Sequence, residues 1–234
     1  MAYGPAYDLQ GAAHARVLAS REMAPAGNPE VVSGIVGELL LVEHDPVVTI
    51  SNRATAQANL LASPELLARS GVEVARTDRG GDITYHGPGQ LVAYPILDLN
   101  LLNLGLHDYM RLLEDVIIAV CAKYGVETAR DSTATGVWTV RDGLAHAKIA
   151  AMGVRVRKWI SMHGLALNVS TNLDHFGLIV PCGLVGRQVT SLERELGAKC
   201  PPMAEVKRVL VEVFLDAIER QKAVAAAARA AASR

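Results

Sequence analysis

One cysteine is placed where a thiol can do chemistry. Cys182 lies in the turn Pro181-Cys182-Gly183, directly after the apolar run 178–180. Such a turn can expose the thiol and offer the following backbone N–H groups to an oxyanion. Cys121 lies on an apolar helical stripe and Cys200 lies beside two prolines, so we interpret both as structural. A single cysteine in a turn is also more often structural than nucleophilic, and the residues alone leave that alternative open.

Lys148 is a second candidate, because it interrupts a stretch of small and apolar residues over 145–153. Such a lysine either reaches solvent from a strand edge or lies in a pocket, where it can act as a base or pair with a thiolate. None of the seven histidines falls into a metal-ligand pattern, and no C-x-x-C sequence occurs. We therefore expect no metal site and no bound cofactor.

The segment 79–90, Arg-Gly-Gly-Asp-Ile-Thr-Tyr-His-Gly-Pro-Gly-Gln, is rich in residues that permit unusual backbone angles. Gly80 and Gly81 allow the main chain to approach a ligand closely, and Arg79 can meet an anionic group. For 87–89, an ordinary hairpin turn is the simpler interpretation. The segment lacks the third glycine of a dinucleotide-binding fingerprint, and the chain contains no Walker A sequence.

The elements that must position these residues alternate without strict βαβ repetition, which predicts an α+β fold with a mixed sheet. Strands are predicted over 35–42, 47–50, 72–77, 90–97, 136–140, 145–156 and 159–168. Helices are predicted over 7–23, 64–70, 112–124 and 203–220. Pro95 indicates that its strand lies at a sheet edge or a bulge. Residues 1–220 form one domain in this interpretation, and the alanine-rich tail 221–234 is frayed or disordered.

Composition excludes several classes of protein. The chain has 234 residues, of which 50% are hydrophobic and 20% charged, and its formal net charge is -1. A disordered chain would have fewer apolar residues and a larger net charge. A protein that binds nucleic acid over a broad basic face would have an excess of positive charge. No run approaches the roughly 18 to 20 apolar residues of a membrane span, and no signal peptide is recognisable. Three cysteines are too few for a disulfide framework, so a cytoplasmic protein is expected.

Seven motifs follow one another over roughly 44–192. They are His44-Asp45-Pro46-Val47-Val48-Thr49, the stretch 79–91, Gly136-Val137-Trp138, Lys148-Ile149-Ala150-Ala151-Met152-Gly153-Val154, His163-Gly164-Leu165-Ala166-Leu167-Asn168, Pro181-Cys182-Gly183-Leu184 and Val189-Thr190-Ser191-Leu192. Any one of these motifs would be weak, but the ordered set is specific. It resembles the lipoyl (octanoyl) transferase family, and the stretch 79–91 carries the strongest likeness.

The resemblance implies a fold similar to the catalytic domain of biotin and lipoate protein ligases, with a mixed main β-sheet, flanking helices and a smaller sheet. The resemblance also implies that Cys182 accepts the acyl group and that Lys148 activates the Cys182 thiol. It also implies a substrate site formed by Arg79, Gly80, Gly81, Asp82, Ile83, Thr84, Tyr85, His86, Ala151, Met152, Gly153, His163, Gly164, Leu165 and Ala166.

The activity implied by the resemblance is transfer of octanoyl from octanoyl-acyl carrier protein to a lysine of a lipoyl domain. The acceptors would be the lipoyl domains of 2-oxoacid dehydrogenase E2 subunits and the glycine cleavage H protein, with no nucleic acid or membrane partner. An ATP-dependent lipoate ligase, which could dispense with the cysteine, and a non-catalytic docking module are the alternatives. Arg155, Arg157 and Lys158 form either a landing patch for the acidic carrier or a solvated charged turn.

Overall fold

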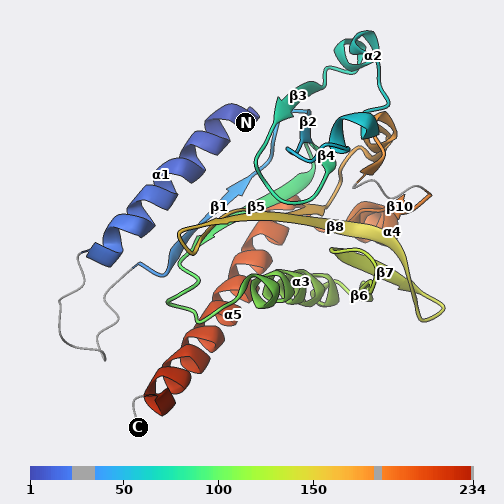
Figure 1. Ribbon diagram of the computed structural model, residues 1–234. Helices are drawn as coiled ribbons and strands as arrows, with labels where there is room; N and C mark the ends of the chain where they lie inside the picture. The colour runs from blue at the N-terminus through green and yellow to red at the C-terminus, as the bar shows by residue number, and fades with distance from the viewer. Residues whose placement is uncertain (23–34, 182–185, 233–234) are drawn as a thin grey trace.

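The computed structural model describes residues 1–22, 35–181 and 186–232, and within them two sheets are packed with helices (Figure 1). The helices are α1 (Tyr3–Glu22), α2 (Pro64–Arg69), α3 (Leu106–Lys123), α4 (Leu192–Leu196) and α5 (Met203–Ala232). The strands are β1 (Gly37–Val42), β2 (Val47–Ile50), β3 (Glu73–Arg76), β4 (Ile83–His86), β5 (Gln90–Leu97), β6 (Thr128–Arg130), β7 (Val137–Arg141), β8 (Leu144–Arg157), β9 (Ile160–Asn168) and β10 (Gln188–Val189). The predicted α+β class is confirmed.

The main sheet has the strand order β1-β5-β9-β8-β7-β6, and its neighbours along this path are antiparallel. The short strand β10 adds to β8 in parallel, so the sheet is mixed, as predicted. The smaller sheet has the order β3-β2-β4, with β3 parallel and β4 antiparallel to β2. The expected pair of sheets, one larger and one smaller, is therefore present.

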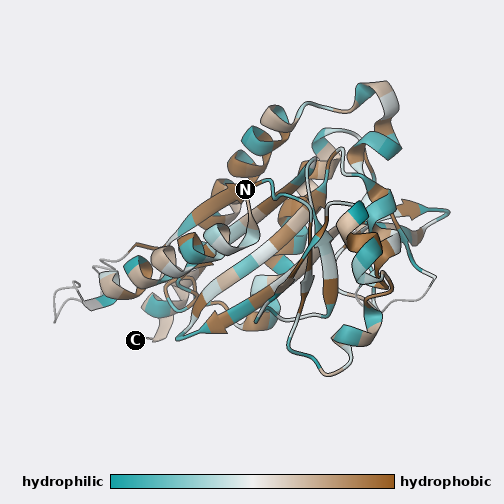
Figure 2. Ribbon diagram, turned by 90° about the horizontal axis from the view of Figure 1, so that it is seen from above, coloured by the Kyte–Doolittle hydropathy of each residue, from teal (hydrophilic) through white to brown (hydrophobic). Residues whose placement is uncertain are grey.

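Helices cover the two faces of the main sheet differently. Helix α1 packs against β1, β5 and β9 on one face, while α3 and α5 lie together on the other (Figure 1). Hydrophobic residues run along the strands, and the helices alternate hydrophobic and hydrophilic residues (Figure 2). Such alternation is typical of a helix that buries one side against a sheet.

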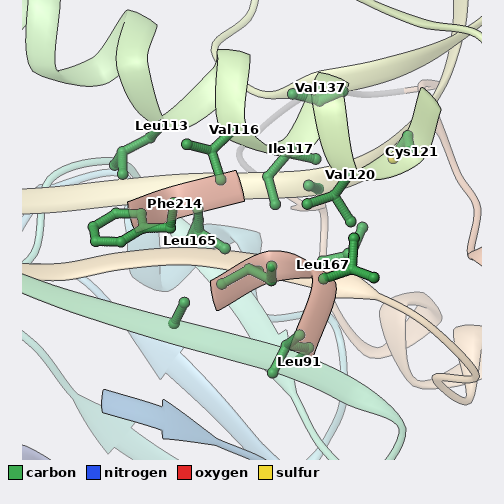
Figure 3. Close-up of a cluster of buried hydrophobic side chains, with 14 of the residues drawn as sticks. Leu91, Leu113, Val116, Ile117, Val120, Cys121, Val137, Leu165, Leu167 and Phe214 are labelled. Atoms are coloured by element: carbon green, nitrogen blue, oxygen red, sulfur yellow. The ribbon is translucent and has the colours of Figure 1, made fainter. Parts of the chain in front are cut away.

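The largest core lies between α3, α5 and the main sheet. Apolar residues of α3 recur at three- and four-residue spacing and point at the strands, where Leu165 and Leu167 of β9 meet them (Figure 3). Phe214 of α5 closes the same cluster. The helical stripe predicted over 112–124 is thus the side of α3 that faces this core, and the helix ends before Gly125, which has a φ of +74°.

Two local interpretations are wrong: the hairpin turn at 87–89 and, of the two alternatives for Pro95, the sheet edge. The turn at 87–89 is not the turn of a hairpin, because β4 belongs to the smaller sheet and β5 to the main sheet. The turn therefore carries the chain from one sheet to the other. Pro95 does not mark an edge strand, because β5 lies between β1 and β9. Its ladder with β9 nevertheless stops at Ala93, and the side chains of Ser161 and Tyr109 donate to the Pro95 carbonyl instead.

Two further segments differ from expectation. The apolar run 35–42 predicts a buried strand, but the strand there, β1, lies at the sheet edge and is mostly half-buried. The last helix continues to Ala232 instead of ending near Arg220, so the alanine-rich segment is helical over its described part. No helix among the described residues has the length and apolar character needed to cross a membrane.

Candidate functional site

A narrow apolar cavity lies between the two sheets. Strand β4 of the smaller sheet forms one wall, and β5, β8 and β9 of the main sheet form the other. The loop before β4 and the first turn of α1 complete the enclosure. The cavity is lined by Tyr3, Arg79, Gly81, Asp82, Thr84, His86, Val92, Tyr94, Ala151, Met152, Gly153, His163, Gly164, Leu165 and Ala166.

Most of the residues predicted for a substrate site line this cavity, although they come from three separate segments of the chain. Gly80, Ile83 and Tyr85 do not. Because side chains alternate along a strand, Thr84 and His86 face the cavity while Ile83 and Tyr85 face the core of the smaller sheet. Tyr85 there donates its hydroxyl hydrogen to, or accepts one from, His175 Nδ1 at 2.7 Å, and burial raises its pKa to about 12.

Three lining residues were not predicted from the sequence. Val92 and Tyr94 follow Gln90 at two-residue spacing on β5, so the alternation of that strand carried a signal that they share one face. Tyr3 comes from the opposite end of the chain and reaches the cavity because α1 packs across β9 and β5. No local sequence pattern marks it, since its position depends on tertiary packing.

Two glycines allow the loop 79–82 to cross β8 closely. The backbone N–H of Gly80 donates to the Val154 carbonyl at 2.9 Å, and a Cβ on Gly153 would lie 2.7 Å from the Gly80 carbonyl oxygen. The Arg79 guanidinium donates through Nη2 to the carbonyl and hydroxyl oxygens of Thr49. The loop is thereby tied to both sheets, which fixes one wall of the cavity.

The wall of the cavity also has a polar part, which is supported by neutral histidines. His44 Nε2 lies 2.6 Å from the Tyr94 hydroxyl, and His86 Nδ1 lies 2.7 Å from Gln90 Oε1. Because Gln90 Oε1 can only accept, His86 donates from Nδ1. Burial lowers the pKa of His44, and burial together with the neighbouring His44 lowers the pKa of His86 to about 3. Desolvation disfavours the charged imidazolium, so both rings are neutral near pH 7.

Asp78 connects the cavity to α1 through His163. It accepts hydrogen bonds from Tyr7 and from His163 Nε2, at 2.9 and 2.8 Å, and forms an ion pair with Arg155. Burial opposes ionisation of Asp78, but the hydrogen bonds from His163 and Tyr7 and the charge of Arg155 outweigh it and lower its pKa. Burial also lowers the pKa of His163 against the opposing effect of Asp78. The Gln10 side chain of α1 accepts from the His163 backbone N–H at 2.8 Å.

A small pocket that contains Lys148 adjoins the cavity. The two spaces share Thr84, Ala151 and Ala166. Further lining residues of this pocket are Gln90, Lys148, Asn168, Phe176, Pro181 and Val189. Lys148 Nζ donates to the Thr135 carbonyl at 3.0 Å and lies 4.9 Å from the centre of the Trp138 ring. Cys182 lies outside the described residues, and the residue before it, Pro181, lines the lysine pocket.

The other two cysteines have surroundings that suit structural roles. Cys121 is fully buried in the core under α3, and burial raises its pKa to about 12. Cys200 is half-buried, and burial raises its pKa as well. Within the described ranges no group of three or more His, Cys, Asp or Glu side chains is arranged to hold a metal ion.

The chain is similar to known proteins over most of its length. The model of the family described as lipoyl protein ligase A/B catalytic domain matches residues 22–215. An octanoyltransferase of Koribacter versatilis is 50% identical over 178 residues, which cover 75% of this chain and 69% of that protein. An octanoyltransferase of Bacteroides fragilis is 48% identical over 180 residues, covering 77% and 80% of the two chains.

The fold is similar to that of solved proteins with much lower sequence identity. A chain from the structure of a bipartite lipoate protein ligase and its E2 lipoyl domain from Thermoplasma acidophilum superposes with a TM-score of 0.64. The identity is 16%, and the superposition covers 94% of this chain and 86% of that one. At this identity the likeness concerns the arrangement of sheets and helices, which agrees with the predicted fold.

Proposed function

Since this chain belongs to the lipoyl protein ligase A/B catalytic domain family and its relatives are octanoyltransferases, we propose that it transfers an octanoyl group in protein lipoylation. The donor is octanoyl-acyl carrier protein, and the acceptor is a lysine of a lipoyl domain. The acceptors expected from the sequence are the lipoyl domains of 2-oxoacid dehydrogenase E2 subunits and the glycine cleavage H protein. The proposed place of action is the cytoplasm.

The observation that carries this proposal is the continuity between the apolar cavity and the lysine pocket. A cavity enclosed by Val92, Leu165 and small residues of β8 and β9 suits an unbranched acyl chain. Each methylene group that leaves water for such a cavity contributes about 0.8 kcal/mol. The carbonyl end of the chain would then lie at the junction, beside Lys148 and next to the segment that contains Cys182.

The proposed reaction has two steps that both use Cys182. The Cys182 thiolate attacks the donor thioester, a new thioester forms on the enzyme, and the thiolate of the carrier leaves. The carrier thiolate takes a proton from the Lys148 ammonium, so Lys148 is left as the neutral amine. A free cysteine has a pKa of about 8.5, so a nearby Lys148 ammonium would increase the thiolate fraction at neutral pH. The acceptor lysine then attacks the acyl-enzyme as its neutral amine. An amide forms, the Cys182 thiolate leaves, and Lys148 takes the proton of the attacking amine.

The turn between β8 and β9 carries the cations Arg155, Arg157 and Lys158. A landing patch for the carrier is the weaker of the two interpretations of these residues. Arg155 already forms an ion pair with Asp78. Lys158 lies ten residues beyond Lys148 along an extended hairpin, which corresponds to about 30 Å at the rise of a β-strand. These observations favour the alternative of a solvated turn for Arg157 and Lys158.

Intact-protein mass spectrometry tests the proposal directly. The purified protein is incubated with octanoyl-acyl carrier protein, and the expected result is one octanoyl adduct on the wild type and on Cys200→Ala but none on Cys182→Ala. An equally abundant adduct on Cys182→Ala would contradict the proposed intermediate. Acylation of a lipoyl domain from free octanoate that depends on ATP and persists in Cys182→Ala would show a ligase instead.

A further inference from the structure

The loop 131–136 forms part of the surroundings of the Lys148 side chain. The Thr135 carbonyl accepts from Lys148 Nζ at 3.0 Å, and the next carbonyl toward the N-terminus, that of Ala134, accepts from the indole N–H of Trp138 at 3.2 Å. The Trp138 ring lies under the ammonium at 4.9 Å. The position of Lys148 Nζ therefore depends on the conformation of a loop that contains two adjacent hydrogen-bonded carbonyl groups.

This loop ends at Gly136, whose φ of +129° is accessible mainly to glycine. A Cβ there would lie 2.7 Å from the Ala150 carbonyl oxygen and 3.2 Å from Lys148 Cε. The loop thus packs directly against the lysine side chain. The backbone N–H of Gly136 donates to Glu114 Oε1, on α3, at 3.1 Å.

Glu114 is a buried carboxylate on α3, and its residue is only 1% exposed. Its second oxygen, Oε2, accepts from Arg111 at 2.7 Å and from Arg130 at 2.9 Å. A buried charge is costly unless it is paired and hydrogen-bonded, and these three donors supply both conditions. The neighbouring Asp115 also pairs with Arg130, but its side chain is 64% exposed.

We propose that Glu114 is a positioning residue for Lys148, acting through the Gly136 N–H and the Thr135 carbonyl of the loop 131–136. This inference rests on the proposed function only in giving Lys148 its role in acyl transfer. The carboxylate does not line the cavity or the lysine pocket. Its loss releases the end of the loop, so the Thr135 carbonyl and Lys148 Nζ move away from the reacting carbonyl. A displacement of about 1 Å in a catalytic group can lower a rate about 100-fold.

The test compares Glu114→Gln with the matched control Asp115→Asn, which removes an acid from the same helix and the same arginine but does not touch the loop. Steady-state transfer of octanoyl from octanoyl-acyl carrier protein to a lipoyl domain is measured for both. We expect the kcat of Glu114→Gln to fall about 30- to 100-fold with KM changed less than threefold, because the cavity keeps its lining. Asp115→Asn should stay within twofold of the wild type.

A second readout reports the position of the lysine without using activity. The chain has two tryptophans, and Trp159→Phe leaves Trp138 as the fluorophore. In that background, Glu114→Gln should change the Trp138 emission in the same direction as Lys148→Met, since both remove the ammonium from the ring. Asp115→Asn should leave the emission unchanged.

The outcomes separate this inference from the proposed function. A kcat within twofold of the control together with an unchanged Trp138 emission would overturn the role of Glu114, even if the melting temperature falls. Full transfer activity in Lys148→Met would instead remove the lysine from the proposed mechanism, and the emission would still decide whether Glu114 positions it. If Glu114→Gln does not fold, Glu114→Asp, which keeps the charge but shortens the side chain, should lower kcat about tenfold, and an unchanged kcat would overturn the inference.

Discussion

At the scale of single residues, the cavity combines an apolar lining with buried histidines that are kept neutral. His86 donates to Gln90, lies with its ring centre 5.7 Å from that of His44, and is 7% exposed. The positive charges of Arg79 and of a protonated His44 or His163 would further oppose its protonation. A charged imidazolium beside an acyl chain would be unfavourable, so the low pKa suits an apolar ligand.

The neutral His86 makes stability depend on pH. Its pKa falls from 6.5 in the unfolded chain to about 3, so between these values the unfolded state binds a proton that the folded state does not. The free energy of unfolding therefore decreases as the pH falls from 6.5 toward 3, with a slope of up to about 1.4 kcal/mol per pH unit from this proton. Urea unfolding of His86→Gln at a series of pH values should show a smaller slope by about this amount.

The control for this prediction is His107→Gln, because the His107 side chain is 78% exposed at the start of α3. Its urea midpoints should follow the wild-type pH dependence. A His86→Gln protein whose stability falls with pH as steeply as that of the wild type would contradict the assignment of a neutral, buried His86.

Gly153 is the residue at which a single methyl group should disturb the site. In Gly153→Ala the new Cβ would lie 2.7 Å from the Gly80 carbonyl oxygen, and this backbone atom must shift. We expect a destabilisation of about 1–3 kcal/mol and a lower kcat/KM for octanoyl transfer, because the loop 79–82 moves from the cavity wall. Gly177→Ala is the matched control, since nothing lies within 4 Å of its added Cβ. Equal stability and kcat/KM in the two variants would refute the close crossing.

At the scale of elements, β8 and β9 form the wall that sets the width of the cavity. Their antiparallel pairing places Ala151 opposite Ala166 and Gly153 opposite Gly164. Gly164 is itself required for packing, because a Cβ there would lie 2.3 Å from the Ala93 carbonyl oxygen on β5. Small residues at these alternate pairs leave space along the strands, and the alanine pair lies where the cavity meets the lysine pocket.

Narrowing this junction should change the preference for acyl chain length. Ala166→Val adds two carbons where the cavity and the lysine pocket meet. Each methylene group that can no longer enter lowers kcat/KM about fourfold, so octanoyl transfer should fall more than butanoyl transfer. The ratio of the two is measured with a series of acyl-carrier thioesters. Ala129→Val on β6, outside the lining, is the control, and an unchanged ratio in Ala166→Val would argue against an acyl chain at this junction.

At the scale of the whole molecule, both terminal helices extend beyond their predicted boundaries. Helix α1 begins at Tyr3 and contributes a residue to the cavity, while the family match begins only at residue 22. The last part of α5 packs on the body of the protein, because Ala225 is fully buried and Gln221 donates to the Leu102 carbonyl at 2.8 Å. Arg229 donates to the Leu101 carbonyl at 3.1 Å.

Deleting residues 221–234 should therefore lower stability while leaving the site intact. The two hydrogen bonds contribute about 1 kcal/mol each, and burial of Ala225 adds a smaller amount, so the expected loss is about 2–3 kcal/mol in urea unfolding. The kcat per folded molecule should not change, since none of these residues lines the cavity. A deletion of 230–234 keeps all three contacts and serves as the control. If the two deletion variants have the same free energy of unfolding, the packing of residues 221–229 does not contribute to stability.

The sequence by itself predicted the fold class, the family, the helical stripe of α3 and most residues of the cavity. It could do so because periodicity marks the buried side of an element, as along 112–124, and because ordered motifs such as 79–91 identify a family. The family is confirmed by the comparisons, and the chemistry of Cys182 and Lys148 stays a prediction.

Only the tertiary structure decided how these segments meet. Whether 87–89 turns within one sheet or crosses between two depends on which strands find partners far away in the sequence, and local turn chemistry is the same in both cases. Tyr3 reaches the cavity, and Glu114 reaches the loop 131–136, through packing between separate elements. The bond of Tyr3 to Thr77 joins residues 74 apart in the chain, and that of Gly136 to Glu114 joins residues 22 apart. Long-range contacts of this kind carry no local pattern, because any residue of suitable size and polarity can make them once the sheets have formed.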